Sequence, residues 1–222
     1  MKRTRLTVFL VVSLALPSAA CLTSLHPWFT QEDLVSEPGL VGAWVDASDA
    51  DTTWVFTRRD DTTYTLVDTR NEGEPDPFSK AAPKPNKIVA TRLTARLMRL
   101  GEARYLDICA GDEWTDNSML QDVLVNSHWL ARLRLEGDAL RVAFLDEGRL
   151  EAMLGDKRIV LPHEVVDVSG DADQPPTRIH SNGRRVLLTA PTSALQQFLA
   201  KYATDGAAFE TEEVMRRMSP AR

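Results

Sequence analysis

The sequence lacks the short motifs by which many enzyme families are identified. It contains no G-x-S-x-G nucleophile elbow, no glycine-rich phosphate loop, no C-x-x-C pair and no paired-cysteine zinc pattern. The segment from His163 to Asp167 has the spacing of a metalloprotease helix, but Asp replaces the second histidine. Pro162 and paired valines indicate an extended segment there instead, which separates positions i and i+4 by about 13 Å. We therefore predict no catalytic residue, no metal site and no cofactor.

Clustered positive charge is also missing. The chain has 26 Lys and Arg residues against 32 Asp and Glu residues, which gives a net charge of −6. Residues 1–20 hold three of the basic residues and none of the acidic ones, so the remaining chain carries −9. Nucleic-acid binding depends on Lys and Arg clusters that neutralise phosphates, and we therefore exclude nucleic acid as a partner. An acidic surface is also repelled by anionic headgroups, so attachment to a membrane requires a separate anchor.

The N-terminus has the order of a secretory signal. Three basic residues within the first five positions precede an apolar run over residues 6–16, and small residues at 18–20 lead to Cys21. The apolar run is shorter than the roughly 20 residues that a membrane-spanning helix needs. We predict that residues 1–20 are a signal peptide and that the protein is exported.

The end of this signal resembles the lipobox of bacterial lipoproteins, in which a cysteine after small residues receives diacylglycerol and becomes the mature N-terminus. Residues 19–21 match that pattern, whereas Ser18 stands where the family usually has Leu. The resemblance implies a lipid anchor on Cys21, and Leu22 in place of Asp implies the outer membrane, facing the periplasm. Ordinary cleavage before the cysteine, which gives a secreted or soluble periplasmic protein, is the alternative, and an uncleaved anchor is a third possibility.

The only other cysteine, Cys109, ends a segment that looks like a strand from Tyr105 onward. In an oxidising compartment a lone cysteine is usually a small buried apolar residue. We predict that Cys109 is buried, with a reactive thiol as the alternative.

The rest of the chain is predicted to form one β-rich domain over residues 40–222, joined to the anchor by a tether over residues 21–39. Apolar and polar residues alternate between polar turns, which is typical of half-buried antiparallel strands. The expected strands are 41–45, 53–57, 63–67, 88–98, 104–109, 129–135 and 139–145. Helical periodicity predicts C-terminal helices at about 192–203 and 209–218.

Gly42-Ala43-Trp44 opens the first of these strands. This Gly-x-Trp resembles the N-terminal motif of lipocalins and other calycins, whose Trp closes the bottom of a small antiparallel barrel. The resemblance implies a mainly β (α+β) fold, either an antiparallel calycin-like β-barrel or a strongly bent sheet, with one or two C-terminal helices. A generic α+β domain in which Trp44 is an ordinary core residue is the alternative.

Three functions are compatible with this sequence. We favour a non-catalytic envelope lipoprotein that presents its β-rich domain to a periplasmic or envelope protein partner. The alternative is a binding module for a small apolar or lipid-like ligand in a calycin-type cavity, which a closed core would exclude. A hydrolase built from dispersed residues such as His128 and Asp107 is the third. The candidate ligand or core residues are Trp44, Trp54, Phe56, His128 and Trp129.

Overall fold

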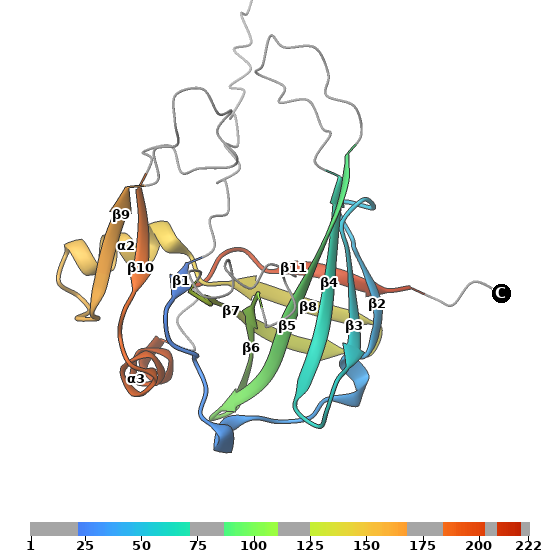
Figure 1. Ribbon diagram of the computed structural model, residues 1–222, viewed down its shortest axis with the longest axis horizontal. Coiled ribbons are helices and arrows are strands. Elements are labelled where there is room, and N and C mark those ends of the chain that lie inside the picture. The colour runs from blue at the N-terminus through green and yellow to red at the C-terminus, as the bar shows by residue number, and fades with distance from the viewer. Residues whose placement is uncertain (1–21, 72–86, 111–124, 168–183, 203–207, 219–222) are drawn as a thin grey trace, which may run out of the picture.

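The computed structural model describes residues 22–71, 87–110, 125–167, 184–202 and 208–218, and its central feature is a closed antiparallel barrel (Figure 1). Eight strands follow one another around the ring, and pairing between β6 and β7 joins the two ends of the strand order. The strands are β2 (Gly42–Asp46), β3 (Thr53–Arg58), β4 (Thr63–Asn71), β5 (Ile88–Leu100), β6 (Ala103–Cys109), β7 (His128–Glu136), β8 (Ala139–Phe144) and β11 (Glu213–Arg217). The predicted calycin-like barrel is confirmed, and so is each strand expected from alternation.

A second layer packs on the outside of this barrel. Its elements are β1 (Thr23–Ser24), the 3-10 turns η1 (Gln31–Asp33) and η2 (Pro38–Leu40), α2 (Glu147–Gly155), β9 (His163–Asp167), β10 (Arg184–Leu188) and α3 (Thr192–Tyr202). Strand β1 pairs with β7 on one side and with β10 on the other, so it joins the small β9–β10 sheet to the barrel. Figure 1 shows α2, β9, β10 and α3 together on one side of the barrel. The predicted helix at 192–203 is present as α3.

The barrel wall therefore separates two apolar cores. The first fills the barrel and includes Leu40, Trp44, Trp54, Phe56, Tyr64, Leu66, Leu97, Leu106, Ile108, Leu133, Val142 and Met215. The second lies outside the wall and includes Leu22, Trp28, Phe29, Met98, Tyr105, Leu130, Leu150, Leu188, Leu195, Phe198 and Phe209. Successive side chains of a strand point to opposite faces, so β5, β6 and β7 contribute alternate residues to each core.

The prediction of a helix over residues 209–218 is wrong, because Glu213–Arg217 forms the last barrel strand. Strand β11 pairs antiparallel with β2 on one side and with β8 on the other. Without it, two strand edges would be left without hydrogen-bond partners. Met215 on this strand is buried in the barrel core, so closing the sheet overrides the helix-forming composition of the segment.

The predicted tether over residues 21–39 is wrong for residues 22–39, which belong to the folded domain. Leu22 and Trp28 are buried in the outer core, and β1 is paired on both sides. The sequence shows only scattered apolar residues there, because each of them enters a core built by distant elements. Cys21 and the predicted signal at 1–20 lie outside the described residues.

The Gly-x-Trp motif packs against an arginine from β11. The guanidinium of Arg217 lies 4.2 Å from the ring centroid of Trp44, and the side chain donates hydrogen bonds to the carbonyl oxygens of Val41 and Gly39. Gly42 has a φ of +137°, and a Cβ at that position would lie 2.7 Å from Nη1 of Arg217. Only glycine fits this conformation and this close approach.

Arg217→Met should destabilise the fold by about 1–3 kcal/mol, because it removes two hydrogen bonds and a cation–π contact. Urea unfolding followed by tryptophan fluorescence measures the change. The neighbouring Arg216 is exposed on the same strand, so Arg216→Met should change stability by less than about 0.5 kcal/mol. Equal losses in the two variants would contradict a stabilising role of these Arg217 contacts.

Candidate functional site

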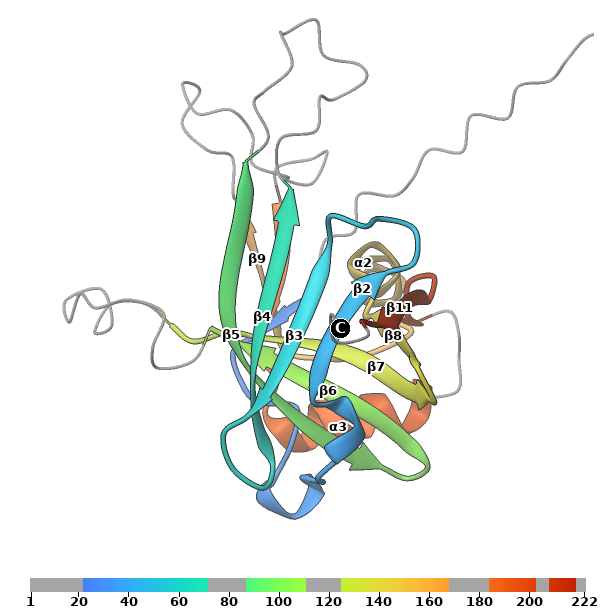
Figure 2. The same ribbon diagram turned by 90° about the vertical axis from the view of Figure 1, so that its right-hand side faces the viewer.

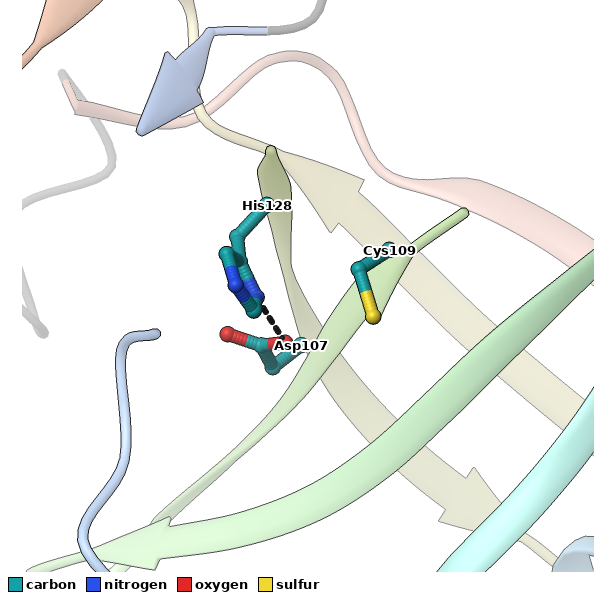
Figure 3. A group of neighbouring side chains, drawn as sticks. All are labelled: Asp107, Cys109 and His128. Carbon is teal, nitrogen blue, oxygen red and sulfur yellow. Dashed lines mark hydrogen bonds and ion pairs between the residues drawn. The ribbon is translucent and has the colours of Figure 1, made fainter. Parts of the chain in front are cut away.

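Polar side chains meet on the outer face of the wall where β6 pairs with β7. Cys109 lies directly opposite His128 in the ladder, and Asp107 lies two residues before Cys109 on the same face. All three are buried, and Asp107 has no exposed surface. Because strands β6 and β7 are held in a closed barrel, the site has a rigid base. Figure 3 shows the three side chains converging.

The strongest contact in the site joins His128 to Asp107. Nδ1 of His128 lies 2.8 Å from Oδ1 of Asp107. The second carboxylate oxygen, Oδ2, accepts a hydrogen bond of 3.0 Å from the backbone N–H of Trp28. Both oxygens of this fully buried carboxylate are therefore satisfied, as a charge removed from water requires.

The segment around Trp28 covers the pair and is itself fixed by α3. Nε2 of Gln196 donates to the carbonyl oxygen of Trp28 and to Oδ2 of Asp33, at 3.2 and 2.7 Å. The hydroxyl of Thr192 donates to the carbonyl of Pro27 at 2.7 Å. Water is thereby kept from the carboxylate of Asp107, and the low dielectric strengthens its bond to His128.

The same face continues along β6 to Tyr105, two residues before Asp107 in the outer core. Its ring stacks on Phe209 with centroids 6.2 Å apart. Burial raises the pKa of the Tyr105 phenol, an effect that the nearby charge of Arg132 partly offsets. The phenol is therefore neutral at physiological pH.

A hollow of about 100 Å³ borders the site on the side of Cys109. Its lining residues are Arg59, Asp60, Thr63, Thr94, Arg96, Cys109 and Asn126. Thr94 pairs with Cys109 across the β5–β6 ladder, and Arg96 pairs with Asp107. The hollow is polar and large enough for about three water molecules, and two arginines and one aspartate line it.

The structure separates the residues predicted as ligand or core positions into two groups. Trp44, Trp54 and Phe56 are buried inside the barrel, and the half-buried Trp129 packs against the same core. Nε1 of Trp44 donates to the carbonyl of Leu40 at 2.9 Å, and Nε1 of Trp54 donates to Oδ1 of Asp68 at 2.8 Å. His128 alone points to the outside of the wall. These rings fill the barrel, which argues against a ligand cavity in its interior.

The sequence pointed to part of the outer site. The predicted burial of Cys109 is confirmed, with 3% of its surface exposed, and His128 and Asp107 were both candidates. The sequence did not predict that these two residues lie close to Cys109, because β6 and β7 are separate strands and no fixed sequence spacing relates their residues. The one available signal was the period-two alternation, which already places Asp107 and Cys109 on one face. The segment from His163 to Asp167 is a strand, as its valines predicted.

Comparisons with protein-family models, curated proteins and solved structures found no match to this chain. Among the described residues, no helix is long and apolar enough to cross a membrane.

Asp107→Ala should destabilise the fold by about 3–5 kcal/mol, because it leaves His128 and the Trp28 N–H buried without their acceptor. Denaturant unfolding gives the value. Asp61 offers a matched control, since its side chain is 94% exposed in an ion pair with Arg58. Asp61→Ala should leave the midpoint within experimental error, and an equal effect of the two changes would contradict the structural role of the buried pair.

Proposed function

We propose that this protein is a non-catalytic envelope lipoprotein that binds a protein partner through the exposed edge of β9. Because aromatic rings pack against one another inside the barrel, we expect a partner to bind at the outer surface. Trp54, for example, contacts Phe56 and Phe144 with ring centroids 5.9 and 6.2 Å apart. The single observation that carries the proposal is the edge strand β9.

Strand β9 has the features of a site for strand addition. It pairs with β10 on one side and with no other strand in the described part of the chain. Its side chains alternate between the two faces of the sheet, yet Val165 and Val166 are 42% and 40% exposed. An exposed edge with apolar side chains on both faces can pair with an added strand, and the neighbouring Pro162 and Glu164 restrict which strands pair there.

The register identifies the backbone groups that face outward. The N–H of Thr189 donates to the carbonyl of Pro162 at 2.9 Å, so Pro162 and Thr189 occupy a hydrogen-bonded position of the ladder, although Pro162 has no N–H to return a second bond. Hydrogen-bonded and non-bonded pairs alternate in an antiparallel ladder. Glu164 and Val166 therefore bond to β10, whereas the N–H and C=O groups of His163 and Val165 point away from the sheet.

The charge of the chain favours one kind of occupant. Glu164 is exposed on β9, and the chain without residues 1–20 carries a net charge of −9. A second copy would meet like charge, whereas an envelope protein with an extended segment of apolar and basic residues would meet complementary charge. We therefore assign the edge to a partner of the second type.

A lipid on Cys21 would place this domain directly at the membrane surface. Leu22 is already buried in the outer core, so no spacer separates the attachment point from the fold. Several acyl chains on one residue form a stable anchor, with about 0.8 kcal/mol for each buried CH₂. The edge of β9 would then be held close to the membrane, where envelope partners are concentrated.

Cys21→Ala should release the protein from the membrane fraction, and intact mass should show that the wild-type chain begins at Cys21 with added diacylglycerol. Cys109→Ala is the matched control, because it removes the other cysteine and should leave both membrane retention and lipid mass unchanged. A wild-type chain that is unmodified and freely soluble would contradict the anchor.

Val165→Pro should weaken partner binding about tenfold or more, because it removes an outward donor while leaving the bonds between β9 and β10 intact. The partner is first captured by a photo-crosslinking residue at position 166 and then purified, so that its affinity can be measured by calorimetry. Val165→Thr keeps the backbone donor and the branched shape, and it should bind within about threefold of the wild type. Equal binding by the two variants, or crosslinks only between copies of this chain, would overturn the proposal.

A further inference from the structure

Beyond partner binding, we propose that Asp107, Cys109 and His128 form a three-ligand site for a divalent transition metal of the zinc type. Each residue offers one ligand atom, and the three atoms lie within 4.8 Å of one another. They combine a carboxylate, a thiolate and an imidazole, which together suit borderline-soft ions such as Zn²⁺ better than Mg²⁺ or Ca²⁺.

The distances require only small side-chain adjustments. Metal–ligand bonds of about 2.0–2.3 Å in a tetrahedral site separate neighbouring ligand atoms by about 3.3–3.8 Å. The contact between Nδ1 of His128 and Oδ1 of Asp107 is 2.8 Å, so it must widen, while any separation near the upper limit of 4.8 Å must narrow. Rotations about the side-chain bonds are sufficient, because all three residues stand on one face of two paired strands.

The surroundings of Asp107 have the form of a supporting shell. The backbone N–H of Trp28 holds Oδ2, which leaves Oδ1 on the side of His128, 2.8 Å from its Nδ1. Outer hydrogen bonds of this kind orient a ligating carboxylate. Zinc-type ions bind the thiolate form of cysteine, so the thiol of Cys109 would release its proton on binding.

The charge balance also favours a divalent ion. A thiolate and a carboxylate together carry two negative charges, which a divalent cation neutralises within a buried site. The neutral complex is compatible with Arg59 and Arg96, which line the hollow beside Cys109. A fourth ligand, such as a water molecule or a small anion, would approach from the Cys109 side, where the hollow lies.

Figure 3 favours a metal over a thiol nucleophile of the triad type. A triad requires the imidazole nitrogen remote from the carboxylate to face the nucleophile. In this view the nitrogen bonded to Asp107 is also the one on the Cys109 side of the ring. One ligand atom of each residue lies within 4.8 Å of the other two, as the ligands of a single ion do.

The test is a Co²⁺ titration of the full chain carrying Cys21→Ser, so that Cys109 is its one thiol. One equivalent of Co²⁺ should produce a thiolate-to-metal charge-transfer band in the near ultraviolet and strong visible bands of a tetrahedral ion, and Zn²⁺ should remove them. Cys109→Ala should abolish the charge-transfer band, and His128→Gln should weaken binding at least tenfold.

His163→Gln is the matched control, because His163 lies on the exposed strand β9 and should leave the titration unchanged. Near-ultraviolet circular dichroism checks that each variant is folded. A folded parent chain without the thiolate band overturns the proposal whatever the variants do. A band that survives Cys109→Ala, or loss of binding in His163→Gln, overturns it as well.

Discussion

The ladder between β6 and β7 is the contact on which both cores depend. It closes the barrel, and its two faces contribute side chains to the interior core and to the outer core. From Tyr105 to Cys109 every residue of β6 is buried, which is unusual for an antiparallel strand, since one face of such strands is commonly exposed to solvent. A polar residue on a doubly buried strand must find a partner within the protein. Asp107 finds His128 on the neighbouring strand and the backbone of Trp28 above it.

The outer core exists because a long insertion folds back on the barrel. This insertion lies between β8 and β11 in the chain and contains α2, β9, β10 and α3. Figure 2 shows β11 returning beside β8 after it. The N-terminal segment is held between this insertion and the wall, as the bonds from α3 to Pro27 and Trp28 show. The fold therefore depends on contacts between residues far apart in sequence, and both ends of the described chain are needed for one closed structure.

The polar side chains of the candidate site lie on the outside of this barrel. The interior is occupied by packed rings, whereas the buried polar cluster and the hollow with two arginines lie on the outer face of the wall. The exposed edge of β9 lies in the same outer layer but uses different residues. A recognition edge and a possible metal site can thus be tested separately, although β10 and β1 connect the two regions through continuous sheet.

The sequence by itself determined the strands, because alternation and β-branched residues are local properties, and it determined the burial of Cys109 and the barrel suggested by Gly42 and Trp44. It also indicated α3 through its apolar stripe. Only the tertiary structure decided that residues 213–217 form a strand, since the edges of β2 and β8 override local helix propensity. Likewise, only the register between β6 and β7 brings Asp107, Cys109 and His128 together, because strand pairing joins positions whose separation in sequence is arbitrary.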